Sequence, residues 1–387
     1  MNPRFSPDRD RLVGMLRRLV RVRSENPSSG EGAVVDLLCG ILAPTADSLE
    51  RIEHVGGRPN LLARYGRCDG SRPTIVLTAS TDTVPADPAT WTHPPFEGGV
   101  HGDELWGRGS VDMKGGIAAA VEAAIGYHTL GRPGPHDVLL AFTADGERGG
   151  RAGWDAMTSG AHWPHLVGAV VTAPSDLVPY RRERGVAWLT ADLQGRTAPA
   201  NDPAGGVSAI LAACETVARL PERATELFSG TSDAGPVVVS VGRIVGGERV
   251  NAVPARCRLE LDVRLPPGAH QVTRESASRL IRDCTREDVR TASSITLYNP
   301  PSETPAGDPF WTAVRGICAD HGVGSSGDPV YSGPTDARFL RQRLNVPTVV
   351  CGPGDERLAH RDDERVPLAE IHRAAQIYFA LLTRHAF

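Results

Sequence analysis

Apolar positions in the outer parts of the chain follow helical spacings that alternate with short β-rich runs. In residues 9–22 apolar side chains recur every three or four positions, which predicts an amphipathic helix. A second helical pattern extends from Gly116 to about Leu130, and a third from about Leu368 to Arg384. The β-rich runs are residues 60–66, 74–80, 137–145, 167–173 and 345–352. This alternation predicts an α/β fold with a mixed, mostly parallel sheet and helices on both faces.

The middle of the chain has a different pattern. Residues 186–195 alternate apolar and polar side chains like a half-exposed strand, whereas residues 207–220 have a helical spacing. Two more strand-like runs follow at 236–247 and 257–268. A succession of this kind predicts a separate α+β unit inserted into the α/β domain.

We therefore expect two domains. Residues 1–182 and 297–387 form a discontinuous α/β domain, and residues 183–296 form the inserted unit. Three consecutive domains are the weaker alternative, because the last part of the chain carries polar motifs that need the N-terminal half.

The charge balance gives no sign of an anionic partner. The 42 Lys and Arg residues against 46 Asp and Glu residues give a net charge of −4, and the pI is near 6.3. No global positive field exists to hold nucleic acid or an anionic membrane. The seven cysteines have no metal-binding or redox spacing, and the N-terminal residues lack the apolar centre of a signal peptide. We expect a cytoplasmic protein without a nucleic-acid or membrane partner.

Polar side chains cluster where predicted strands end. One strand leads into Asp82 and another into Glu147, while Asp112 precedes a predicted helix and His360 follows the last strand-like run. In open α/β sheets ligands bind at the carboxyl ends of the strands, so we expect these groups to converge. Carboxylates and an imidazole together can hold a divalent metal ion.

Five motifs occur in an order that resembles a known enzyme family. They are WGRGSVDMKGG at 106–116, the TADGE loop at 143–147, GGERVNAVPARCRLELDVR at 246–264, SGPTDARFL at 332–340 and GPGDERLAH at 352–360. With them the chain resembles, over almost its whole length, the zinc metallopeptidase family that includes acetylornithine deacetylase, succinyl-diaminopimelate desuccinylase, aminoacylase and carboxypeptidase G. The resemblance implies an aminopeptidase-like catalytic domain with an inserted dimerisation lid, a homodimer through that lid and a small amino-acid-like substrate.

The resemblance assigns one complete set of metal ligands. The family holds its second metal with a bridging Asp, a Glu and a His, which here match Asp112, Glu147 and His360. Two carboxylates and one imidazole with open positions suit one Zn²⁺ or a similar ion. We expect one divalent metal, with zinc favoured. The alternative is an empty cleft in which the three side chains only form hydrogen bonds.

Other positions depart from the family's pattern. The two ligands private to the first metal, the general-base Glu and the lid His are replaced by Ser80, Ala173, Gly146 and Pro199, respectively. A missing general base costs roughly 10²–10⁴ in rate. Asp82 would normally orient the missing first-metal His, so it becomes the candidate catalytic group, as an acid/base or a substrate contact. The alternative is a loop cap bonded to backbone amides.

The positions that hold the substrate in the family are better preserved. Asn251, Arg264 and Arg338 match residues that shape the lid and hold a substrate carboxylate. Arginine suits a carboxylate because its planar fork donates two parallel hydrogen bonds. For the two arginines the alternative is a structural ion pair in the lid or hinge.

Three functions stay open on this reading. The favoured one is an enzyme with non-hydrolytic chemistry, such as cyclisation, acyl transfer or elimination, in which the substrate supplies its own nucleophile. The second is a mono-metal amidohydrolase that deacylates N-acyl amino acids with a replacement base. The third is a catalytically silent binding dimer.

Overall fold

The computed structural model describes residues 5–28, 30–132, 134–159, 163, 165–230, 233–324 and 327–384. The chain divides into two units. Unit 1 comprises Met1–Arg181, Glu303–Pro329 and Thr335–Phe387, and unit 2 comprises Arg182–Ser302 and Val330–Pro334.

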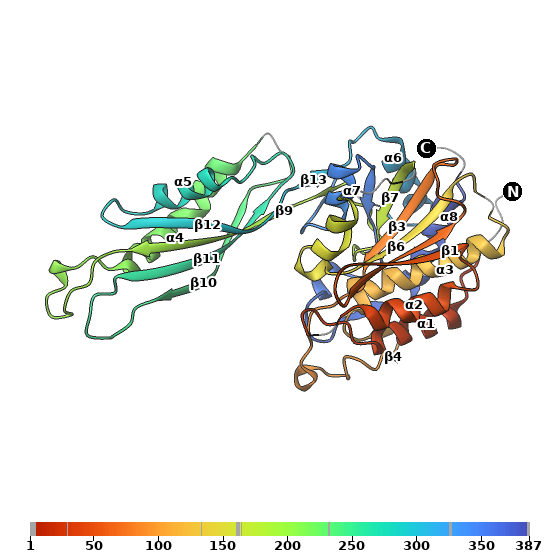
Figure 1. The fold of residues 1–387 in the computed structure, drawn as a ribbon, viewed down its shortest axis with the longest axis horizontal. Helices are drawn as coiled ribbons and strands as arrows, with labels where there is room; N and C mark the ends of the chain where they lie inside the picture. The colour runs from red at the N-terminus through yellow and green to blue at the C-terminus, as the bar shows by residue number, and fades with distance from the viewer. Residues whose placement is uncertain are drawn as a thin grey trace. The chain divides into compact units, whose positions relative to one another are not determined.

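A six-stranded mixed sheet forms the centre of unit 1 (Figure 1). In spatial order its strands are β1 (Ser48–Val55), β2 (Arg58–Tyr65), β6 (Asp137–Thr143), β3 (Thr74–Ser80), β7 (Leu166–Val171) and β15 (Thr348–Val350). The first three strands in this order are antiparallel neighbours, and β6, β3, β7 and β15 run parallel. Every residue of β3 and β6 is buried, as expected for strands covered on both faces.

Helices pack around this sheet. α1 (Arg9–Arg21) is capped at its N-terminus by Asp8, whose side chain accepts a hydrogen bond from the Arg11 amide. α3 (Gly115–Thr129) packs against α8 (Leu368–Leu382), and the other α-helices of the unit are α2 (Gly32–Leu42), α6 (Pro309–Asp320) and α7 (Ala337–Arg343). Gly116 allows α3 to approach the end of β7, because a Cβ at this position would collide with Thr172.

Unit 2 is an antiparallel sheet with two helices. The strand order is β10 (Val238–Gly246), β11 (Arg256–Leu265), β9 (Gly185–Gln194) and β12 (Arg290–Asn299). β9 and β11 alternate buried and more exposed residues, and α4 (Ala209–Phe228) and α5 (Arg274–Cys284) pack against the sheet. The short strands β8 (Arg182–Glu183) and β14 (Val330–Tyr331) pair in parallel in this unit. β12 continues past residue 296, where we expected the inserted unit to end.

Helix α4 is longer than its sequence pattern predicted. The predicted helical segment ends at Leu220, directly before Pro221, a residue type that interrupts the hydrogen bonding of a helix interior. The observed helix continues through Pro221 to Phe228. Leu220, Ala224 and Phe228 follow one another at intervals of four and are all buried, so tertiary packing outweighs the local cost of the proline.

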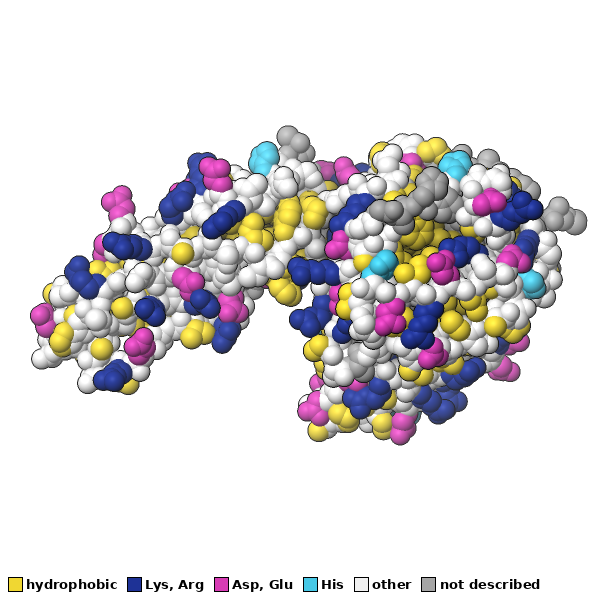
Figure 2. All heavy atoms as spheres, in the orientation of Figure 1, with side chains coloured by type: hydrophobic (Ala, Val, Ile, Leu, Met, Phe, Trp, Pro, Cys, Tyr) yellow, Lys and Arg dark blue, Asp and Glu magenta, His cyan; other side chains and the backbone are white. Residues whose placement is uncertain are grey.

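On the face shown in Figure 2, basic and acidic side chains are interspersed, and no large region carries charges of a single sign. Among the described residues, no helix combines the length and apolar character needed to span a bilayer. All seven cysteines are free thiols.

Candidate metal centre

Three predicted ligands meet at one edge of the unit 1 sheet, and each comes from a different loop. Glu147 follows β6, Asp112 precedes α3, and His360 follows β15. The Nε2 atom of His360 lies 3.1 Å from Oδ2 of Asp112 and 3.1 Å from Oε2 of Glu147. One possible ligand atom from each residue lies within 4.8 Å of the others. The structure therefore brings together the metal set expected from the sequence.

The electrostatics of this cluster suit a cation. Hydrogen bonds with Asp112 and Glu147 raise the pKa of His360 to about 10, so the imidazole carries a proton at neutral pH. The pKa of Glu147 is raised to about 7, mainly because its carboxylate is buried. The protonated His360 offsets one of the two carboxylate charges, and a divalent cation would replace that proton and offset both. Two carboxylate oxygens and one imidazole nitrogen are a donor set that Zn²⁺ accepts.

The neighbouring part of the site is filled by close packing. A Cβ built on Gly146 would touch the Cβ of Ser80 and lie 2.6 Å from its Oγ. The Ser80 hydroxyl donates a hydrogen bond of 3.3 Å to the sulfur of Met113. Ala173 is 3% exposed, and a Cβ on Gly352 would lie 2.5 Å from its carbonyl oxygen. This backbone therefore leaves no room for a side chain at position 146.

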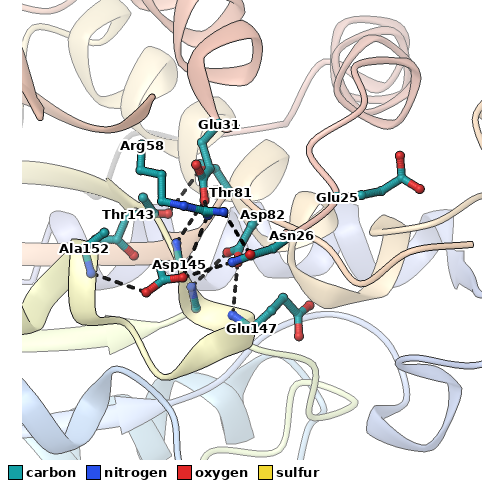
Figure 3. Close-up of polar contacts among 12 residues, drawn as sticks. Glu25, Asn26, Glu31, Arg58, Thr81, Asp82, Thr143, Asp145, Glu147 and Ala152 are labelled. Atoms are coloured by element: carbon teal, nitrogen blue, oxygen red, sulfur yellow. Dashed lines mark hydrogen bonds and ion pairs between the residues drawn. The ribbon is translucent and has the colours of Figure 1, made fainter. Parts of the chain in front are cut away.

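Asp82 is buried and bonded to the loop that carries Glu147. Its Oδ1 accepts from the Gly146 amide at 2.9 Å, and its Oδ2 accepts from the Glu147 amide at 3.1 Å and from Nδ2 of Asn26 at 2.9 Å. In Figure 3 the backbone of Glu147 faces Asp82 while its carboxylate points away. Burial raises the pKa of Asp82. These contacts match the loop-cap alternative, and a catalytic role for Asp82 stays a prediction.

A network of polar side chains extends from Asp82 behind the same loop (Figure 3). Nδ2 of Asn26 also donates to Asp145, and Arg58 donates to Asn26 and to Glu31 at 2.9 and 2.8 Å. Asp145 has a left-handed backbone, with φ of 67°, and its amide donates to Glu31. The sequence analysis missed Asn26, Glu31 and Arg58, because they lie outside the periodic patterns and bind the loop by contacts that no motif encodes.

A second buried carboxylate missed by the sequence analysis is Glu364. It accepts hydrogen bonds from backbone amides of the loop that carries Asp112. The available signal was its position four residues after His360 in the same segment.

The three predicted substrate residues do not lie in one unit. Arg338 belongs to unit 1, is 4% exposed and donates to the carbonyl oxygens of Thr335 and Gly149, both at 2.7 Å. In unit 2, Arg264 is bonded to Asp262 on its own strand, at 2.6 and 3.1 Å. Asn251 is exposed in the loop between β10 and β11. Substrate binding by these residues stays a prediction.

Comparison with known proteins identifies the family. Residues 76–384 match the family model described as peptidase family M20/M25/M40. The chain belongs to this family. Among its relatives, succinyl-diaminopimelate desuccinylase from Paracoccus denitrificans is 32% identical over 388 residues, covering 95% of this chain and 96% of the relative. Acetylornithine deacetylase from Vibrio vulnificus is 27% identical and covers 95% of both chains.

Solved structures share the fold. Aminopeptidase PepT from Bacillus cereus superposes with a TM-score of 0.76 at 20% identity, covering 97% of this chain and 98% of the other. A dinuclear metal binding peptidase of the M20 family from Bacillus subtilis has a TM-score of 0.68 at 16% identity, covering 97% of both chains. The resemblance and the α/β fold class predicted from the sequence are confirmed.

Proposed function

We propose that this M20 member is a single-metal enzyme that moves an acyl group between nitrogen atoms of amino-acid-derived molecules, without water as the nucleophile. The observation that carries the proposal is the glycine at position 146, where an added side chain would collide with Ser80. Glycine has no proton-accepting side chain, and the packing leaves no space for one. Loss of a general base costs hydrolysis roughly 10²–10⁴ in rate, because water is a weak nucleophile until a proton is removed from it.

The metal in this proposal is one divalent ion, with zinc favoured. Asp112, Glu147 and His360 would hold it. When bound, such an ion supplies a Lewis acid that polarises a substrate carbonyl. The protein's own side chains would fix the position of the ion, and the proton on His360 would leave as the ion binds.

The proposed reaction consumes no water. An amine of the substrate, or of a second molecule, attacks the carbonyl carbon of an amide. A new C–N bond forms, the original C–N bond breaks, and the proton of the attacking amine passes to the departing nitrogen. A neutral amine is nucleophilic without a base of the kind that water needs, so Gly146 is compatible with this chemistry.

Hydrolysis of an N-acyl amino acid is the second candidate. The similarity to relatives named succinyl-diaminopimelate desuccinylase and acetylornithine deacetylase favours it. It needs a replacement base, for which Asp82 is the sequence-based candidate. In either case we propose that Arg338 of unit 1, and Asn251 and Arg264 of unit 2, each serve in substrate binding, as the resemblance to the family implies.

The deciding experiment follows labelled oxygen. Zinc-loaded protein is incubated with acetylornithine or succinyl-diaminopimelate in water enriched in heavy oxygen, with and without an added amine, and products are analysed by mass spectrometry. We expect transfer of the acyl group with no heavy oxygen in the product, and loss of this product in Asp112→Ala. Released acid that carries heavy oxygen would overturn the proposal in favour of hydrolysis. No turnover of either compound would overturn it in favour of a binding protein.

We also propose a homodimer through unit 2. β10 is an edge strand, and its Val238, Ile244 and Val245 are each 49% exposed. Exposed apolar edge strands are templates for pairing with another chain. Ile244→Glu should shift sedimentation from dimer to monomer, whereas Val100→Glu, at a 40% exposed position of unit 1, should leave the dimer intact. A wild-type monomer at micromolar concentration would contradict this arrangement.

A further inference from the structure

We infer that Glu364 is a positioning residue for the metal centre, which fixes the loop of Asp112 against the segment that carries His360. The inference rests on the proposed metal site. Glu364 supplies no ligand atom to the cluster of Asp112, Glu147 and His360. Its role would be to set the direction from which two of those ligands approach the ion.

The carboxylate of Glu364 is surrounded by donors. The side chain is fully buried, and its Oε1 accepts from the amides of Val111 at 2.8 Å and Asp112 at 3.0 Å. Its Oε2 accepts from the Gly109 amide at 2.9 Å and from Nη1 of Arg108 at 2.7 Å. Three of the four donors are backbone amides, so the carboxylate holds the path of the main chain.

The shape of the loop is adapted to this carboxylate. Gly109 has φ of 82°, a left-handed conformation that glycine adopts without strain. A Cβ at this position would also lie 2.6 Å from Cγ2 of Thr83. The turn at Gly109 places its own amide and those of Val111 and Asp112 where one carboxylate can bind all three.

The segment of Glu364 is attached to the same loop through its backbone. The carbonyl oxygen of Glu364 accepts from the Gly107 amide at 2.9 Å. Directly after it, β16 (Arg365–Pro367) pairs with β5 (Glu104–Trp106), which leads into the loop. His360 lies four residues before Glu364. One residue thus connects two ligand-bearing segments that are far apart in the sequence.

The charge of Glu364 is compensated without a metal. Arg108 forms a buried ion pair with it, and the Arg108 guanidinium lies 5.1 Å from the ring centre of Trp91. A carboxylate with an arginine and three amides has no need of a further cation. Residues that orient metal ligands in this way typically change metal affinity about 10–100-fold when they are substituted.

Glu122 offers a matched control. It is also fully buried, and it also accepts from an arginine, Arg11, and from a backbone amide, that of Asp8. Its contacts join α1 to α3 and do not involve the loop of Asp112. A glutamine at either position keeps the size of the side chain and removes the charge, so both variants lose stability for the same reason.

The test compares zinc affinity in Glu364→Gln, Glu122→Gln and the wild type by competition with a chromophoric chelator at neutral pH. We expect zinc to bind about 10–100-fold more weakly to Glu364→Gln, and with little change to Glu122→Gln. Cobalt-loaded Glu364→Gln should also show an altered visible spectrum, which a loss of stability alone would not produce. Equal zinc affinities and equal cobalt spectra in the three proteins would overturn the inference.

A measurement on the wild type covers the case in which Glu364→Gln does not fold. Hydrogen exchange of metal-free protein should show protected amides at Gly109, Val111 and Asp112, because the carboxylate binds them without metal. Fast exchange of these amides would overturn the inference. A folded wild type that binds no zinc would instead overturn the metal assignment of the proposed function, which is a distinguishable result.

Discussion

Two adjacent parts of one loop cluster have different structures. In one part, Asp112, Glu147 and His360 place their ligand atoms around a common point. In the other, position 146 is a glycine, and any side chain added there would collide with Ser80. The difference teaches that the missing ligands are not simply absent side chains in an open cleft. The backbone at position 146 does not accept a side chain, while the remaining set keeps two buried carboxylates, Asp82 and Glu364, behind its loops.

The strongest test of this comparison removes a ligand from the part that contains Asp112, Glu147 and His360. His360→Ala should reduce zinc in the purified protein from about one equivalent per chain to a trace, since two carboxylates alone make a poor zinc site. Elemental analysis measures this. His93→Ala, which removes a histidine that stacks on His101 outside the cluster, should keep the zinc of the wild type. Two equivalents of zinc per chain in the wild type would contradict the conclusion that only one metal ion binds.

The second test uses pH. The pKa of His360 is raised from 6.5 to about 10 in the metal-free fold, so between pH 7, near the pKa of Glu147, and pH 10 zinc displaces one proton and its affinity should rise about tenfold per pH unit. The same raised pKa means that protonated His360 stabilises the metal-free fold below about 6.5, a contribution lost as pH rises to about 10. Because the ring is 53% exposed, solvent weakens this contribution.

Calorimetric titrations of zinc in buffers with different ionisation enthalpies would count the released protons. The His360→Asn variant is the control, since it has no imidazole proton to lose. A zinc affinity of the wild type that does not change across the interval would contradict the raised pKa.

The third test addresses the part of the site around Gly146 and Ser80. Gly146→Ala should lower the free energy of unfolding by about 1–3 kcal/mol, because the new methyl group overpacks against Ser80. In a Ser80→Gly background the same substitution should cost much less, because the atoms that it meets are gone. Urea unfolding of the four proteins forms a double-mutant cycle. Additive effects, within about 0.5 kcal/mol, would show that the two residues do not touch.

The smallest expected effect concerns Asp82. Asp82→Asn keeps one acceptor oxygen, so a backbone amide of Gly146 or Glu147 loses its partner at a cost of about 1 kcal/mol in unfolding free energy. Zinc affinity should fall modestly, because the loop of Glu147 is less well held. A large fall in turnover with unchanged zinc affinity would instead support the catalytic role predicted from the sequence.

The sequence predicted the parts of the molecule that follow a repeated pattern. The continuous apolar runs at 74–80 and 137–145 correspond to β3 and β6, and the polar residues after the strands converge as expected. The contacts of Glu364, and of Asn26 with Asp82, could not be predicted, because a carboxylate that binds backbone amides depends on the shape of the other loop. The contact of Gly146 with Ser80 depends likewise on a few tenths of an ångström in backbone position.

That contact also restricts the routes by which this site could change. A carboxylate at position 146 would bring its Cβ against the Cβ of Ser80. A histidine at position 80 keeps that Cβ, so the two side chains of a two-metal relative cannot both be introduced on this backbone. A return to the family's pattern therefore needs a shift of the loop as well as new side chains, which makes the glycine at position 146 harder to reverse than a substitution at an open position.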